Sequence, residues 1–291
     1  MKFTELFEQG RFVVTGEVGP SKGSDAEDAI RRARTMAPAV DAVNVTDNQS
    51  AVMRLGSLAV CRLLKQEGIE PVFQLTCRDR NRIALQSDLL SATALGVENV
   101  LILTGDHPVL GDHPEAKTVF DLDSVQLLAA ARGLNQGHDM AGHELDRPTA
   151  LCLGAVVNPG SDELETQLIK MEKKIEAGAE FFQTQAVYDS AVFARFMERA
   201  ARFGVPVMVG IVPLKSAGMA KFMNANVAGV HVPDNVIQRM AAVPKSDRKK
   251  VSLEIAVELI AEMKGMCQGV HIMPLGWEAL VPEIVAAAGL R

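Results

Sequence analysis

The chain has 291 residues, and its 30 basic and 36 acidic residues give a formal net charge of −6 at pH 7. This length suits one α/β barrel, and scattered charges of both signs argue against nucleic acid or an anionic membrane surface as the main partner. No apolar run approaches the ~20 residues that span a bilayer, and the N-terminus lacks the apolar core of a signal peptide. We therefore expect a cytoplasmic protein with no membrane span.

Eight short apolar runs bounded by turn residues predict β-strands. They cover residues 12–17, 42–46, 71–76, 99–104, 150–156, 181–185, 206–211 and 269–274. Helix-like stretches lie between them at 24–37, 50–67, 81–95, 162–177 and 190–203, and glycine, a common helix C-cap, directly follows four of these. This repeat predicts one α/β domain over residues 1–291, a (β/α)8 TIM barrel. The absence of GxGxxG after the first strand disfavours a dinucleotide-binding Rossmann domain.

Two long polar segments interrupt the repeat, at residues 107–121 and 136–148. Long loops in a compact domain are either functional or loosely ordered. The first follows the fourth strand and is predicted to belong to the active site. The second is predicted to be an exposed connection on the non-catalytic side of the barrel. Its His138 and His143 have no evident third ligand, so no metal site is expected.

The four cysteines form no CxxC pair, and their spacings match no zinc motif. They are Cys61, Cys77, Cys152 and Cys267. We expect four reduced, mostly buried thiols with packing roles.

Six consecutive predicted strands end in carboxylates, amides or hydroxyls. These endings include Glu17, Thr46-Asp47-Asn48, Gln74 with Thr76, Thr104-Gly105-Asp106, Asn158 and Gln183-Thr184-Gln185. The carboxyl ends of barrel strands converge on the catalytic face, so this series predicts a polar ligand site at the barrel mouth. Glu17 stands out because burial would favour its protonated form, which suits a general acid; a buried carboxylate that caps a loop is an equal alternative.

At these residues the sequence resembles methylenetetrahydrofolate reductases over nearly the whole chain. The matching segments are short but occur in the family's order and spacing. They are Thr15-Gly16-Glu17, Val45-Thr46, Leu75-Thr76-Cys77 with Arg80 and Asn81, Gly105-Asp106 with Pro108, Lys174 with Ala177-Gly178-Ala179, Thr184-Gln185, and Gly210-Ile211-Val212-Pro213.

The resemblance implies a flavin-dependent hydride transfer that interconverts methylenetetrahydrofolate and methyltetrahydrofolate in one-carbon metabolism. It implies FAD as the cofactor, with FMN as the alternative. Glu17 and Asp106 would be the catalytic residues, and with Gln185 they would contact the folate. The implied cofactor-binding residues are Thr46, Gln74, Thr76, Thr104, Gly105, Asp106, Asn158 and Lys174.

Three positions depart from the family's pattern. Gln74 replaces a histidine and Thr104 replaces an arginine, both of them flavin contacts in the family. Residues 214–219 hold no aromatic side chain that could stack on a nicotinamide, and Phe222 is expected on the following helix. We therefore expect a partner protein, in a homo- or hetero-oligomer, to exchange electrons in place of NADH.

Other functions also fit parts of the pattern. A folate-binding methyltransferase barrel that passes a methyl group to a corrinoid protein would have a similar fold and substrate without a flavin. A flavin-carrying electron-transfer subunit is a non-enzymatic alternative, which the presence of Glu17, Asp106 and Gln185 disfavours. Trp277 follows the last strand and either lines the site or, as favoured for a lone Trp, packs beneath it.

Overall fold

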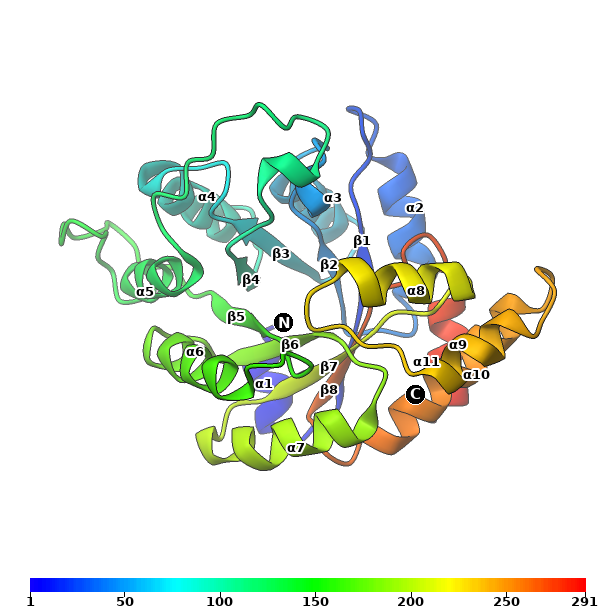
Figure 1. Cartoon of the computed structure of the whole chain (residues 1–291). Helices are drawn as coiled ribbons and strands as arrows, with labels where there is room; N and C mark the ends of the chain where they lie inside the picture. The colour runs from blue at the N-terminus through cyan, green and yellow to red at the C-terminus, as the bar shows by residue number, and fades with distance from the viewer.

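A computed structural model describes all 291 residues, and in it eight parallel strands close into one barrel surrounded by helices (Figure 1). The strands are β1 (Val13–Val18), β2 (Ala42–Val45), β3 (Pro71–Thr76), β4 (Asn99–Leu103), β5 (Cys152–Val157), β6 (Phe181–Ala186), β7 (Val207–Ile211) and β8 (Gly269–Ile272). The predicted (β/α)8 TIM barrel is confirmed, and each predicted strand is present with its ends within two residues of the expected ones.

Most of the helices lie around the barrel and connect successive strands, whereas α1 precedes β1 and α11 follows β8. They are α1 (Phe3–Glu8), α2 (Glu27–Met36), α3 (Ser57–Gln66), α4 (Arg82–Ala94), α5 (Ser124–Asn135), α6 (Leu164–Glu176), α7 (Ser190–Ala200), α8 (Ala217–Asn226), α9 (Asp234–Ala241), α10 (Arg248–Met263) and α11 (Leu280–Ala287), with short 3₁₀ turns at Gln49–Ala51, Pro108–Leu110 and Ala201–Phe203. No helix combines the length and apolar character needed to cross a membrane.

The predicted helix over residues 50–67 is wrong in its first half. Residues 49–51 form a 3₁₀ turn, and a loop precedes α3. Ser50 has a φ of 56°, which an α-helix does not allow. The loop takes its hydrogen bonds from elsewhere, because the amide of Leu55 donates to the carbonyl of Ser21 and that of Arg54 donates to Asn48 Oδ1.

The interior of the barrel changes from apolar at one end to polar at the other. Side chains alternate along a strand, so every second residue of β1 points inward. Of these, Val13 packs in an apolar cluster with Phe181, Thr15 is buried above it, and Glu17 reaches the cavity at the mouth. The site is therefore built on the polar end of a packed barrel.

Helix α1 covers the apolar end of the barrel. Phe3 and Leu6 are buried in the same cluster as Val13 and Phe181, and the rings of Phe3 and Phe181 meet edge-on with centroids 5.1 Å apart. Figure 1 shows α1 behind β6. This helix was not among the predicted elements.

The two irregular segments lie at opposite ends of the barrel. Residues 107–121 follow β4, and in Figure 1 they arch over the strand ends between α3 and α4. Residues 136–148 connect α5 to β5, and a bridge between His138 and Glu144 closes them into a small exposed hairpin. The prediction of an exposed connection on the non-catalytic side is confirmed.

Candidate active site

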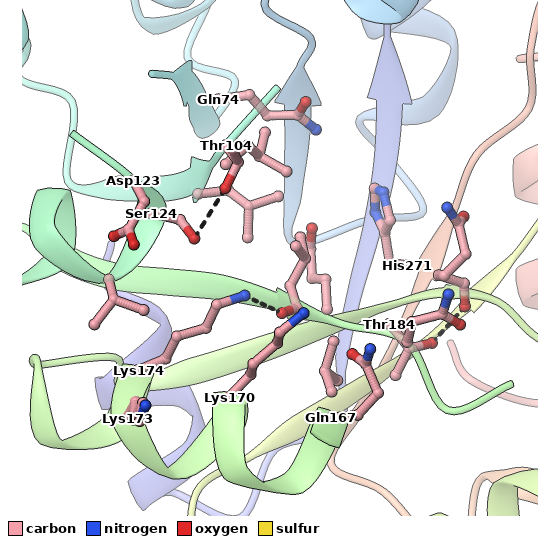
Figure 2. Close-up of a pocket in the computed structure, with 18 of the residues that line it drawn as sticks. Gln74, Thr104, Asp123, Ser124, Gln167, Lys170, Lys173, Lys174, Thr184 and His271 are labelled. Carbon is pink, nitrogen blue, oxygen red and sulfur yellow. Dashed lines mark hydrogen bonds between the residues drawn. The ribbon is translucent and has the colours of Figure 1, made fainter. Parts of the chain in front are cut away.

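A cavity of about 610 Å³ opens at the carboxyl ends of the strands, where barrel enzymes carry their active sites. Its volume is within the range of about 300–1,000 Å³ that is usual for small-molecule sites. Six of the ten predicted site residues line it: Glu17, Gln74, Thr104, Asn158, Lys174 and Gln185. Figure 2 shows the polar side chains around this space, which come from strands and helices on several sides.

Glu17 lies at the floor of the cavity, and only 8% of it is exposed. Its Oε2 atom accepts a hydrogen bond from Gln74 Nε2 at 3.1 Å and lies 3.4 Å from His271 Nε2. A buried carboxyl group needs such partners because a desolvated charge or polar atom is costly. The arrangement leaves one side of the carboxyl group to face the cavity.

A buried polar network continues beneath Glu17. Thr15 Oγ1 lies 2.9 Å from His271 Nδ1 and accepts a hydrogen bond from Gln183 Nε2 at 3.4 Å. The amides of Gln183 and Asn44 bond to each other at 2.8 and 3.3 Å. These side chains come from β1, β2, β6 and β8, so the network joins opposite walls of the barrel.

Helix α6 supplies a wall of positive charge. Lys170, Lys173 and Lys174 all line the cavity, and Figure 2 shows Lys170 and Lys174 extending from α6 toward the strand ends. Lys174 Nζ donates to the carbonyl of Val156 at 2.7 Å. Burial, with a smaller contribution from the charge of Lys170, lowers the pKa of Lys174 to about 8. Three lysines in an acidic chain give this wall a positive charge that would favour an anionic group.

A β-bulge in β6 sets the direction of Gln185. The register with β7 shifts between Gln183 and Ala186, and bulges next to active sites commonly re-aim a side chain. Gln185 Oε1 accepts a hydrogen bond from the amide of Ala186, which leaves the amide nitrogen of this side chain without a partner in the protein. Gly210 permits the bulge, because a Cβ there would lie 2.4 Å from the carbonyl oxygen of Thr184.

Thr104 and Asn158 line the cavity but also hold loops. Thr104 Oγ1 donates to Ser124 Oγ at 3.2 Å, which ties the end of β4 to the start of α5. Asn158 Nδ2 donates to the carbonyl of Ala228, and its Oδ1 accepts from the amide of Gly160. Asn158 thereby connects the loop after β5 to the loop after α8.

Four predicted site residues lie outside this cavity: Thr46, Thr76, Gly105 and Asp106. Thr76 donates its hydroxyl to the buried carboxylate of Asp47 at 2.9 Å. Asp106 is exposed, and its backbone oxygen accepts from Arg78. Thr46 Oγ1 is buried and has no hydrogen-bond partner. These four residues stay predictions as cofactor or folate contacts.

Three residues that line the cavity, His271, Lys170 and Lys173, are not among the residues predicted from the sequence. His271 is the second inward-facing position of β8, opposite Thr15 in the register with β1. A period-two count from the start of β8 would have placed it inside the barrel beside Glu17. Lys170 precedes Lys174 by four residues, the spacing that places two side chains on one helix face.

No Phe, Tyr or Trp lines the cavity. Phe222 lies on α8, as predicted, and 61% of it is exposed. Trp277 packs against the main core and lies between the ammonium groups of Lys215 and Lys249, 5.8 and 5.7 Å from its ring centre. The prediction that Trp277 packs rather than lines the site is confirmed.

Solved structures share the fold at low sequence identity. An uncharacterized protein from Clostridium thermocellum, described as binding two copies of 5-methyl-5,6,7,8-tetrahydrofolic acid, matches with a TM-score of 0.64 at 16% identity, and the match covers 97% of each chain. An oxaloacetate acetylhydrolase matches with a TM-score of 0.54 at 13% identity over 100% of this chain and 82% of that one. Such likeness describes the barrel and not its chemistry.

Sequence comparisons are more specific. "Methylenetetrahydrofolate reductase 2" of Schizosaccharomyces pombe is 26% identical over 80% of this chain and 38% of its own length, and a probable NADPH-dependent methylenetetrahydrofolate reductase of Caenorhabditis elegans is 22% identical over 77% and 33%. The chain thus spans a third or slightly more of these two relatives. The 5,10-methylenetetrahydrofolate reductase of Pectobacterium carotovorum is 26% identical over 87% of this chain and 81% of its own.

The family model described as methylenetetrahydrofolate reductase matches residues 2–289, which is almost the full length and includes every strand of the barrel. The chain belongs to the methylenetetrahydrofolate reductase family.

Proposed function

We propose that this protein reduces methylenetetrahydrofolate to methyltetrahydrofolate, with a flavin as its cofactor. The observation that carries the proposal is a single buried carboxyl group, Glu17, at the floor of a cavity with one cationic wall. The relatives named methylenetetrahydrofolate reductase support this substrate, as does the structural neighbour described as binding 5-methyl-5,6,7,8-tetrahydrofolic acid.

Glu17 acts as the acid in this proposal. It gives its proton to the folate, which opens the ring that bridges the one-carbon unit, and a hydride then completes the methyl group. The free amide nitrogen of Gln185 donates to the pterin from the opposite wall. Burial of Glu17 excludes bulk water from the proton, so that it is transferred to the bound substrate.

The cavity residues fit a flavin. The lysines of α6 would hold its phosphate, while Val125, Val156 and Val157 provide an apolar surface for its ring. A bound flavin would supply the hydride. The same cationic wall accommodates one or two phosphates, so both FAD and FMN fit the proposal. Asp106 and Gly105 would join the contacts only through movement of the loop after β4.

The electron donor is proposed to be a partner protein. The cavity has no aromatic side chain to stack on a nicotinamide, and Phe222 lies on the outer surface of α8. A redox partner that docks at the mouth would reach the cofactor without a nicotinamide site. The proposal therefore includes a hetero-oligomer during turnover.

The test is an anaerobic absorption spectrum of the purified chain, followed by additions of methyltetrahydrofolate and then of NADH. We expect a yellow protein that methyltetrahydrofolate bleaches and NADH does not. Bleaching by NADH would contradict the proposal that a partner protein donates the electrons. A colourless protein that still binds folate would contradict the reductase and favour the methyltransferase alternative.

The variant Glu17→Gln tests the acid directly. It should bind flavin as the parent does and lose about 10²-fold or more of the rate with folate, because a positioned acid contributes about 10²–10⁴-fold. Glu262→Gln, on the exposed side of α10, is the matched control and should keep the parent rate. An unchanged rate in Glu17→Gln would refute the proposed role of Glu17.

A further inference from the structure

We infer that His271, together with Gln74, fixes the transferable proton of Glu17 on its Oε1 atom. His271 is then a positioning residue that acts through Glu17 and does not itself meet the substrate. The inference rests on the proposed role of Glu17 as the acid. It adds a residue that the motifs of the sequence do not single out, and it states which oxygen of the carboxyl group reacts.

Both nitrogen contacts of the carboxyl group reach the same oxygen. Gln74 Nε2 lies 3.1 Å and His271 Nε2 lies 3.4 Å from Glu17 Oε2, and no protein group donates to Oε1. The oxygen that accepts the Gln74 hydrogen bond is the carbonyl oxygen of a neutral carboxyl group, because a proton on it would point at the amide donor and at the nearby nitrogen of His271. The proton therefore belongs on Oε1, the oxygen left for the substrate.

The tautomer of His271 follows from the network beneath it. Gln183 Nε2 donates to Thr15 Oγ1, so the threonine hydroxyl has its own proton free for His271 Nδ1, 2.9 Å away. Nδ1 is then an acceptor, and a neutral imidazole carries its single proton on Nε2, toward Glu17. The paired amides of Asn44 and Gln183 hold the donor nitrogen of Gln183 toward Thr15.

The barrel holds the acid from both sides. His271 lies on β8, whose register places it opposite Thr15, two residues before Glu17 on β1. Gln74 reaches Glu17 from β3, across β2. All three side chains are at least nine-tenths buried, so water competes little for these polar contacts. A site built on strands in this way keeps the carboxyl group in one orientation.

The first test measures the tautomer in the full chain without substrate. The protein has six histidines, and spectra of the ¹⁵N-histidine-labelled chain would be compared with those of His271→Gln to identify the signal of His271. We expect a neutral ring with its proton on Nε2, and a shift of that Nε2 signal in Glu17→Gln. A proton on Nδ1, or on both nitrogens at neutral pH, would overturn the inference.

The second test separates positioning from folding. His271→Leu should lose about 10²-fold in kcat, within the range for a positioned acid, with little change in the KM for folate. His271→Gln should recover most of that loss, because its amide can still donate to Oε2. His138→Gln, in the exposed hairpin, is the matched control and should behave as the parent. Equal kcat in His271→Leu and the parent would overturn the inference.

The outcomes distinguish the inference from the proposed function. If Glu17→Gln keeps the parent rate, the proposed role of Glu17 as the acid is wrong. If Glu17→Gln loses the rate and His271→Leu does not, only the positioning role is wrong. Far-UV circular dichroism shows whether His271→Leu folds. If it does not fold, the tautomer measurement and the rate of His271→Gln test the inference instead. A kcat of His271→Gln as low as that of Glu17→Gln would then contradict the role of His271 as a hydrogen-bond donor to Glu17.

Discussion

Lys174 is the cavity residue whose charge changes closest to neutral pH. Burial lowers its pKa from 10.5 to about 8, and the nearby charge of Lys170 lowers it further. The ammonium group is therefore mostly charged at pH 7 and mostly neutral at pH 9. An anion that binds beside it would favour the charged form and move the change to a somewhat higher pH.

We expect the chain to bind FMN more weakly as the pH rises from 7 to 9. A charge-assisted hydrogen bond is worth about 1.5–3 kcal/mol, but the charged fraction of Lys174 falls only about tenfold between pH 7 and pH 9, so the affinity should fall about 5- to 10-fold. Quenching of flavin fluorescence measures this affinity. Lys174→Met should bind weakly at both pH values, whereas Lys245→Met, at an exposed position, should keep the parent's pH dependence. A parent affinity that is constant over this range would contradict the role of Lys174.

The site residues show what motifs can and cannot predict. Glu17 and Lys174 both line the cavity: the end of a strand pointed to Glu17, the family resemblance pointed to Lys174, and their roles stay predictions. Asp106 has its expected neighbours in the sequence, but it does not line the cavity, and Gly105 before it has a φ of 92°. His271 belongs to no motif, and although the alternation along β8 points it inward, its contact with Thr15 depends on the register between β8 and β1, which joins residues over 250 positions apart.

Helix α1 and β6 form a closed, apolar end of the barrel, and Gly154 makes room for it. The Phe181 ring packs over β5 at this glycine, and a Cβ there would lie 2.2 Å from the ring. The ring cannot move away, because Phe3 of α1 packs against its other side. Helix α1 was not predicted, because its six residues give too short an apolar pattern and its burial comes from packing against the barrel.

Gly154→Ala should therefore destabilise the protein by about 1–3 kcal/mol, the usual cost of an overpacked core. Thermal or urea unfolding measures the difference. Gly265→Ala is the matched control, because no atom lies within 4 Å of a Cβ at that exposed glycine, and it should stay within about 0.5 kcal/mol of the parent. Equal stability of the two variants would contradict this prediction and would mean that Phe181 and α1 shift enough to accommodate the added methyl group.

Across the whole molecule the strand order was easier to predict than the connections. The strands of a parallel barrel are buried on both faces and therefore appear in the sequence as continuous apolar runs. Eight such runs with helices between them were almost sufficient to predict the closed barrel. The prediction for the segment before α3 was wrong because two of its amides have partners outside a helix: Leu55 donates to the carbonyl of Ser21, far earlier in the chain, and Arg54 donates to the side chain of Asn48. Contacts such as the one with Ser21 are not visible in a local pattern, and they determine the paths of the loops at the mouth.

The reactivity of the four buried cysteine thiols can be used to measure how the barrel opens. All four cysteines are free and buried, as predicted, and they lie in different parts of the chain. Burial raises every one of their pKa values: well above the ordinary value for Cys61, to about 12 for Cys77 and Cys152, and to about 11 for Cys267. At pH 8 the native chain therefore holds almost no thiolate, which is the reactive form.

We expect Ellman's reagent at pH 8 to label all four cysteines of the native chain slowly and together, because each must wait for the same opening of the barrel. In 6 M guanidinium chloride all four should react at once, since the unfolded thiols regain a pKa of about 8.5. Ser87→Cys, on the exposed side of α4, is the positive control and should add one fast thiol to the native chain.

One fast native thiol in the parent would instead locate a segment that opens by itself, and mass spectrometry of the labelled peptide would identify it. Cys77 follows β3 near the loops of the mouth, so fast labelling there would mean that the catalytic end of the barrel opens separately from the end that α1 covers.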